Sequence, residues 1–224
     1  LTGSITYIAV VVSAVSLSGE LDLRGKLAAT MVIIWCSRLG LFLFTRISKD
    51  GEDRRFREIK INPLRFLGAW TLQALWVILT AACAIAIITT REQKEVDVFL
   101  IVGALMWVTG FGIEVVADAQ KRAFRKDPAN QGKFIQSGLW AWSQHPNYFG
   151  EIALWTGVLI MAIPILHGGA WLCVISPLFV FLLLTRVSGI PMLDEHAKQK
   201  WGDDPDYLSY VERTSKLLVR PPRR

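Results

Sequence analysis

Six apolar segments divide this chain, and most are close to the roughly 20 residues that a helix needs to cross a bilayer. They are Ser4–Leu17, Leu27–Thr45, Phe66–Ile88, Val96–Val116, Tyr148–Leu166 and Ala170–Leu184. Of the 224 residues, 52% are hydrophobic and only 20% are charged, which suits an integral membrane protein better than a soluble domain. The pattern predicts an all-α, polytopic transmembrane helical bundle.

The first segment is short, and the chain begins at Leu1 rather than Met. We therefore expect six spans here and seven in a full chain, all within one transmembrane domain, residues 1–224. After the last span, Pro191 can open a helix that Gly202 ends, and a second short helix begins near Tyr207. These features predict C-terminal amphipathic helices over residues 190–219.

Basic residues alternate between the ends of the predicted spans. The loop 46–62 holds six Lys or Arg residues, the loop 119–134 holds five, and the tail from Arg186 holds eight. The intervening loops are poorer in basic residues, so the positive-inside rule places both basic loops and the C-terminus in the cytosol. This topology and contact with anionic lipid explain the net charge of +6, and no nucleic-acid partner is needed.

The cysteines and histidines do not suggest a metal site. Cys36, Cys83 and Cys173 lie far apart inside apolar segments, with no CxxC motif and no Cys/His ligand spacing. The three histidines are equally scattered. We expect neither a bound metal nor a disulfide.

A polar motif stands at the start of the fifth apolar segment. The run Ser143–Glu151 reads SQHPNYFGE, and it places Asn147 and Glu151 four residues apart, on one face of a helix. A carboxylate at the edge of a bilayer is costly, which favours a functional site over an interfacial turn whose polar groups face headgroup water.

Two further groups of polar residues fall in or beside the spans. Arg38 lies in the middle of the second segment and needs a partner or water, which indicates a polar cavity. The fourth segment ends in an acid-then-base stripe on one helical face, formed by Glu114, Asp118, Arg122 and Arg125. The stripe is either a salt-bridged helix end or a binding wall, where carboxylates take hydroxyls and arginines take phosphates.

Three motifs together resemble the membrane steroid 5-alpha-reductase superfamily, and more narrowly its bacterial DUF1295 branch. They are ExxxDxQKxxF from Glu114 to Phe124, GLWxWSQHPNYFGE from Gly138 to Glu151, and WGDDPDYxxY from Trp201 to Tyr210. The resemblance implies an enzyme of the bacterial inner membrane that binds NADPH in a cytosol-facing cavity. It also implies hydride transfer to a conjugated carbon–carbon double bond of a lipophilic substrate, with residues 1–90 as substrate half and 91–224 as cofactor half.

Matched by position, the resemblance assigns cofactor contacts to Asp118, Arg125, Asn147, Glu151 and Arg186, and also to Tyr148, Glu195 and Tyr207. Glu114, Arg122 and His145 belong to the same stripe and motif and complete the expected set. Steroid reductases polarise the substrate ketone with a tyrosine, but the matching position here is Trp35. An indole N–H can donate a hydrogen bond but is not a usable proton source, so Arg38 or Tyr7 would supply the donor.

Two other functions fit part of the same pattern. An S-adenosylmethionine-dependent methyltransferase of the isoprenylcysteine carboxyl type shares an RHPxYxG core, although its leading arginine is Gln144 here. A non-catalytic membrane protein that retained the fold is the third alternative. The sequence names neither the substrate nor the oligomeric state.

Overall fold

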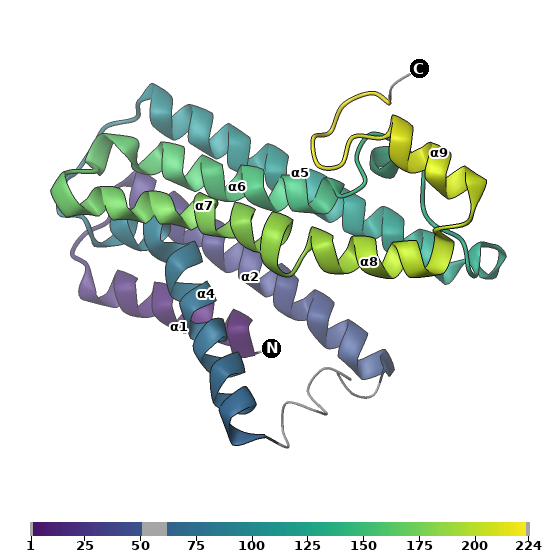
Figure 1. Ribbon diagram of the computed structural model, residues 1–224. Coiled ribbons are helices and arrows are strands. Elements are labelled where there is room, and N and C mark those ends of the chain that lie inside the picture. The colour runs from purple at the N-terminus through teal and green to yellow at the C-terminus, as the bar shows by residue number, and fades with distance from the viewer. Residues whose placement is uncertain (1, 51–61, 223–224) are drawn as a thin grey trace. The chain divides into compact units, whose positions relative to one another are not determined.

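The computed structural model describes residues 2–50 and 62–222, and throughout these ranges the regular structure is helical (Figure 1). The predicted all-α membrane bundle is confirmed, because five helices in this part of the chain are long and apolar enough to cross a membrane. They cover Leu23–Thr45, Pro63–Thr89, Val98–Lys126, Pro146–Ile165 and Gly168–Trp201. The first apolar segment forms a shorter helix of 16 residues. Most of the basic loop 46–62 lies outside the described residues.

The α-helices are α1 (Thr2–Leu17), α2 (Leu23–Asp50), α4 (Pro63–Thr89), α5 (Val98–Lys126), α6 (Pro146–Ala162), α7 (Ile175–Leu182), α8 (Ile190–Trp201) and α9 (Pro205–Arg213). Shorter helical turns are η1 (Pro128–Asn130), η2 (Gly138–Ala141), η3 (Ile163–Ile165), η4 (Gly168–Val174) and the π-helical η5 (Leu183–Val187). Helix α5 continues past Val116, where the apolar segment ends. The stripe from Glu114 to Arg125 therefore lies on a helix, as its spacing indicates.

Local sequence signals explain several helix ends. The Asn62 side chain accepts hydrogen bonds from the backbone N–H groups of Leu64 and Arg65, and Pro63 supplies a first-turn residue that needs no donor. In the same way α8 has a proline in its first turn and Gly202 as its C-cap, as predicted. The second C-terminal helix ends at Arg213 and does not reach residue 219, because the chain beyond it bonds to residues 142–144 instead.

The chain divides into two compact units. One consists of Leu1–Val102 and Val158–Ser176, and the other of Gly103–Gly157 and Pro177–Arg224. Below, the first is called the N-terminal unit and the second the C-terminal unit.

In the N-terminal unit, α1, α2 and α4 pack against one another around a buried aromatic cluster. The ring of Tyr7 meets Trp35 edge-on at a centroid distance of 5.2 Å and meets Trp76 in the same way at 5.3 Å. Tyr7 is completely buried and Trp35 is 1% exposed. Edge-to-face packing of this kind adds to the stabilisation from burial alone, so the cluster fixes the three helices together.

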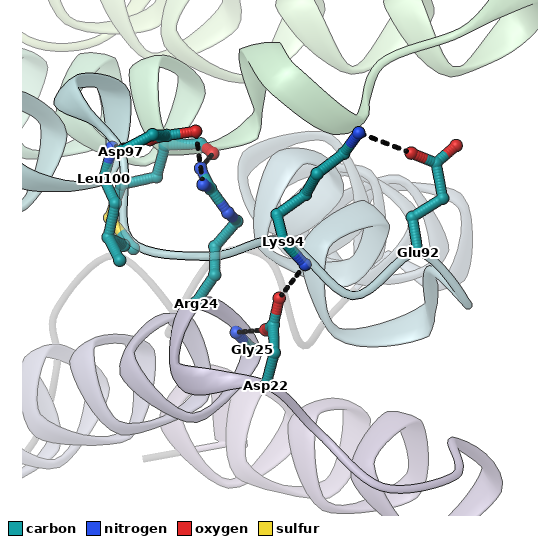
Figure 2. A network of polar contacts seen from close by, with 8 residues as sticks. Asp22, Arg24, Gly25, Glu92, Lys94, Asp97 and Leu100 are labelled. Atoms are coloured by element: carbon teal, nitrogen blue, oxygen red, sulfur yellow. Dashed lines mark hydrogen bonds and ion pairs between the residues drawn. The ribbon is translucent and has the colours of Figure 1, made fainter.

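A polar network ties the start of α2 to the chain before α5 in the same unit (Figure 2). The buried Arg24 side chain donates to Asp97 at 2.8 Å and to the carbonyl oxygen of Met161. Asp97 also accepts from the backbone N–H of Leu100 at 2.8 Å and thereby caps α5. Asp22 links the N–H groups of Gly25 and Lys94. A charge buried in this way must be paired, and the network supplies the pair.

In the C-terminal unit, glycines let α5 and α6 approach closely. A Cβ atom added at Gly110 would lie 2.6 Å from the Gly150 carbonyl oxygen, and one added at Gly150 would lie 2.5 Å from the Gly110 oxygen. Seven residues further along α6, about two turns, a Cβ atom added at Gly157 would lie 2.6 Å from the Gly103 carbonyl oxygen. The two helices are therefore antiparallel and in backbone contact along this glycine seam, which is a common packing mode in membranes.

Candidate functional site

The polar motif forms the turn that starts α6, and its first residues hold the end of the chain. Ser143 donates to the carbonyl oxygen of Leu217 at 2.8 Å and accepts from the N–H of His145. The Gln144 side chain donates to the carbonyl oxygens of Val211 at 3.0 Å and Thr214 at 2.8 Å. Ser143 and Gln144 therefore anchor the segment after α9, a structural role that the sequence did not indicate.

The structure brings together two of the predicted cofactor residues, Asp118 on α5 and Asn147 on α6. The Asn147 amide nitrogen donates to the Asp118 carboxylate at 3.2 Å, and both side chains are half-buried. The contact depends on the glycine seam, because Gly150 lies one turn along α6 from Asn147 and touches α5 directly. The two residues thus lie close enough to contact one ligand.

His145 is buried beside a small charged cluster. Its Nε2 atom lies 3.4 Å from a carboxylate oxygen of Asp194 on α8, and Asp194 also pairs with Lys216. The imidazole stacks on the Tyr148 ring at a centroid distance of 5.7 Å. Burial lowers the pKa of His145 to about 4; the Asp194 carboxylate opposes this shift, whereas Lys121 and Lys216 add to it. The ring is therefore neutral at physiological pH.

This lowered pKa predicts a pH-dependent stability. An unfolded histidine titrates near 6.5, so between pH 6.5 and 4 the unfolded chain binds a proton that the folded chain does not. Stability should fall as pH falls through this window, by roughly 3 kcal/mol from His145 alone. We expect melting temperatures from pH 8 to about pH 4 to decline less steeply in His145→Gln than in the wild type. Parallel curves would contradict this assignment.

A cavity of about 390 Å³ opens beside this cluster, within the C-terminal unit. Among the residues that the structure describes, four in the lining are Lys or Arg, whereas Asp194 is the one carboxylate. The basic residues are Lys121, Arg125, Lys133 and Lys200, joined by His145 and His196. A concave surface with this charge balance attracts anions and concentrates them at the site.

Aromatic side chains make up much of the remaining lining. The rings of Phe134 and Tyr207 lie 5.2 Å apart, and those of Phe134 and Trp201 lie 5.8 Å apart. Two polar tips are fixed by backbone carbonyl groups: Trp201 donates to Gly132 at 2.6 Å, and Tyr210 donates to Trp140 at 2.8 Å. Burial raises the pKa of Tyr210, so its hydroxyl remains a donor. The cavity thus pairs cations with flat apolar surfaces.

The predicted cofactor residues are distributed unevenly around this cavity. Arg125, His145 and Tyr207 line it. Asp118 and Asn147 do not line it but contact each other, and each lies a few residues along the chain from a lining residue. The others lie outside the lining: Glu114, Arg122, Tyr148, Glu151, Arg186 and Glu195. Among these, Glu114 is buried beside Gly150, and Glu195 accepts from Gln199 on its own helix at 3.0 Å. Lys133, Lys200 and Phe134 line the cavity but were not predicted, because no motif spacing links them to α5.

The three predicted catalytic residues belong to the N-terminal unit. Tyr7 and Trp35 form the buried aromatic cluster, and the Tyr7 hydroxyl donates to the Trp76 carbonyl oxygen at 3.5 Å. Arg38 is half-buried about one turn after Trp35 on α2. Their part in any reaction stays a prediction. In the described part of the chain, no group of three or more His, Cys, Asp or Glu residues is arranged to hold a metal ion.

Comparison with known proteins identifies the family of this chain. A family model described as "Protein of unknown function (DUF1295)" matches residues 1–214. The chain belongs to the DUF1295 family. This DUF1295 protein is also 25% identical over 127 residues to "Probable O-methyltransferase ustE" from Ustilaginoidea virens. That alignment covers 57% of the chain and 43% of the relative, so the chain spans less than half of the relative's length. No solved structure matches it.

Proposed function

We propose that this protein is a membrane-embedded reductase that uses NADPH to reduce a conjugated carbon–carbon double bond in a lipophilic substrate. The observation that carries the proposal is the cavity of the C-terminal unit, where four Lys or Arg side chains and one carboxylate surround an aromatic lining. NADPH is strongly anionic through its phosphates and also carries flat rings. Both properties complement this lining.

The residues present fit such a cofactor. Lys121, Arg125, Lys133 and Lys200 would hold phosphate oxygens, and Trp201 and Tyr207 would pack against an aromatic ring. The Asp118–Asn147 pair would take hydroxyl or amide groups. The volume of about 390 Å³ lies in the lower part of the range of roughly 300–1,000 Å³ for ligand sites, which suits the phosphate-bearing part of the molecule.

When bound, NADPH would supply the hydride, and the chain's own residues would bind and orient it and exclude water. His145 is neutral and buried, so it would add no positive charge of its own and could accept or donate one hydrogen bond. We propose that this site and the C-terminus lie on the cytosolic side of a bacterial inner membrane, because the positive-inside rule puts long basic loops on that side. Membership of the steroid 5-alpha-reductase superfamily, suggested by the three motifs, is part of the same proposal.

A methyltransferase is the second candidate, because the relative described above is named as one. Its methyl donor, S-adenosylmethionine, has a positively charged sulfonium and an ammonium group, balanced by a single carboxylate. A lining with four cationic side chains would repel that donor, unless Asp194 offsets them. The charge balance therefore favours the reductase.

Thermal shift of the detergent-purified protein separates the two candidates. A saturating ligand raises the melting temperature only when it binds the native state, and about 100 times its Kd adds about 2.7 kcal/mol. We expect a rise of several degrees with NADPH, less with NADH and none with S-adenosylmethionine. A rise with S-adenosylmethionine alone would replace the reductase with the methyltransferase. NADPH binding without turnover of any enone would favour a non-catalytic protein.

Arg125 offers a sharper test of the cavity, because it belongs to the predicted set and also lines the cavity. Arg125→Ala should weaken NADPH binding by about tenfold, the loss expected for one charge-assisted hydrogen bond. The affinity, measured by tryptophan fluorescence titration, should also depend less on salt. Lys198→Ala is the matched control, since Lys198 is exposed on α8 and does not line the cavity. Equal losses in both variants would contradict the assignment.

A further inference from the structure

Two cysteines that lie 90 positions apart in sequence meet inside the N-terminal unit. The sulfur atoms of Cys83 on α4 and Cys173 on η4 are 3.3 Å apart. The Cys83 thiol also donates to the carbonyl oxygen of Cys173 at 2.9 Å. No sequence pattern pairs them, because they fall in different apolar segments with no shared motif. Both thiols are free and buried.

A neighbouring contact holds the two sulfurs opposite each other. The Ser176 hydroxyl donates to the carbonyl oxygen of Thr80 at 2.6 Å, and both groups are completely buried. Thr80 lies three residues before Cys83, and Ser176 three residues after Cys173, so the two segments run antiparallel in a fixed register. A thiol pair held in this way has little freedom to turn apart.

We propose that Cys83 and Cys173 form a reversible disulfide site that cross-links α4 to η4. A disulfide bond is about 2.05 Å long, so the sulfurs need to approach by little more than 1 Å. The reaction requires a small, lipid-soluble disulfide as oxidant, because both cysteines lie within predicted membrane spans. In outline, the two protein thiols become one disulfide while the oxidant's disulfide becomes two thiols.

The order of attack follows from exposure. Cys173 is 7% exposed, whereas Cys83 is completely buried, so Cys173 meets the oxidant first. Its sulfur attacks the oxidant disulfide, forms a mixed disulfide and expels one thiol, which takes the proton. The Cys83 sulfur then attacks the sulfur of Cys173, loses its proton and expels the second thiol. Among the described residues, Cys36 has no cysteine partner, and its thiol donates to the Ile33 carbonyl oxygen at 3.4 Å. Cys36 therefore serves as an internal comparison for the Cys83–Cys173 pair.

The test uses dithiodipyridine, an apolar disulfide whose released thiopyridone is measured by absorbance. The folded, detergent-purified protein is treated, digested without reduction and mapped by mass spectrometry. We expect a peptide that joins Cys83 to Cys173, lighter by two hydrogen atoms than the two free thiols, and no retained adduct on either. The melting temperature should rise by roughly 5 °C, because the cross-link closes a long loop, and dithiothreitol should reverse the rise.

Single variants define the pathway. Cys83→Ala should keep a stable adduct on Cys173, because the second thiol is missing. Cys173→Ala should leave Cys83 slow to react. The proposal is overturned if wild-type protein keeps adducts on both cysteines, if neither cysteine reacts while the protein is folded, or if the cross-link forms between chains. None of these outcomes depends on the identity of the cofactor.

Discussion

Replacing Gly150 with alanine should destabilise the protein by about 3 kcal/mol, the upper part of the usual range for overpacking. The added Cβ would lie 2.5 Å from the Gly110 carbonyl oxygen and 2.8 Å from the Glu114 backbone nitrogen. Both neighbours are backbone atoms of α5, so no side chain can turn away to relieve the contact. The helices must separate, and we expect the melting temperature in detergent to fall by roughly 10 °C.

The same substitution should also weaken the NADPH binding that we propose. Separation of α5 from α6 would pull Asn147 away from Asp118, whose side chains are 3.2 Å apart in the native protein. Gly112→Ala is the matched control, because Gly112 lies on α5, the helix that faces Gly150, and a Cβ there meets nothing within 4 Å. It should be neutral or slightly stabilising, since alanine favours a helix over glycine. If Gly150→Ala and Gly112→Ala changed the melting temperature equally, close packing at the glycine seam would be contradicted.

Local signals were sufficient to predict most of the helical fold. Pro191 and Gly202 mark the two ends of α8 because of their own backbone properties. Proline suits the first turn, where its missing N–H is not needed, and glycine is favoured where a helix ends. The length and apolar composition of the segments likewise predict the long helices. The apolar segment ends at Val116, but α5 continues to Lys126, because the charged stripe lowers hydropathy without ending the helix.

The candidate site was harder to predict because its contacts join residues that are far apart in sequence. The resemblance assigns Asp118 and Asn147 to one cofactor site, but no local signal predicts the hydrogen bond that joins them in the structure. Phe134 and Lys133 could not be found in this way, because they lie in an irregular segment whose path is set by tertiary contacts. Gln144 stands where the methyltransferase core has an arginine, and in the structure its side chain donates to two carbonyl groups at the end of α9.

The second large effect that we expect is at Asp97 in the N-terminal unit. Desolvation raises the pKa of Asp97, but the backbone N–H of Leu100 and the Arg24 guanidinium together lower it below its usual range. The carboxylate is therefore charged at neutral pH and pairs with an Arg24 side chain that is fully buried. Removing one partner of such a pair leaves a buried charge without compensation, which costs about 3–5 kcal/mol.

We expect Asp97→Asn to destabilise the protein by about 3 kcal/mol, the lower end of that range, because the Asp97 side chain is 33% exposed and its charge is partly screened. Asparagine can still accept from the Leu100 N–H, so the cap on α5 survives and the loss reports the charge alone. Chemical denaturation in mixed micelles, compared at one detergent concentration, would measure it.

The double variant Arg24→Met with Asp97→Asn distinguishes a charge effect from a loss of packing. Methionine fills much of the space of the arginine stem without carrying a charge, so the double variant should recover at least half of the stability lost in Asp97→Asn. Figure 2 shows why the recovery should be incomplete: Arg24 reaches from the start of α2 to Asp97, and this link is lost in both variants. If the double variant were no more stable than Asp97→Asn, Arg24 would act through its contact with the Met161 carbonyl group rather than through its charge.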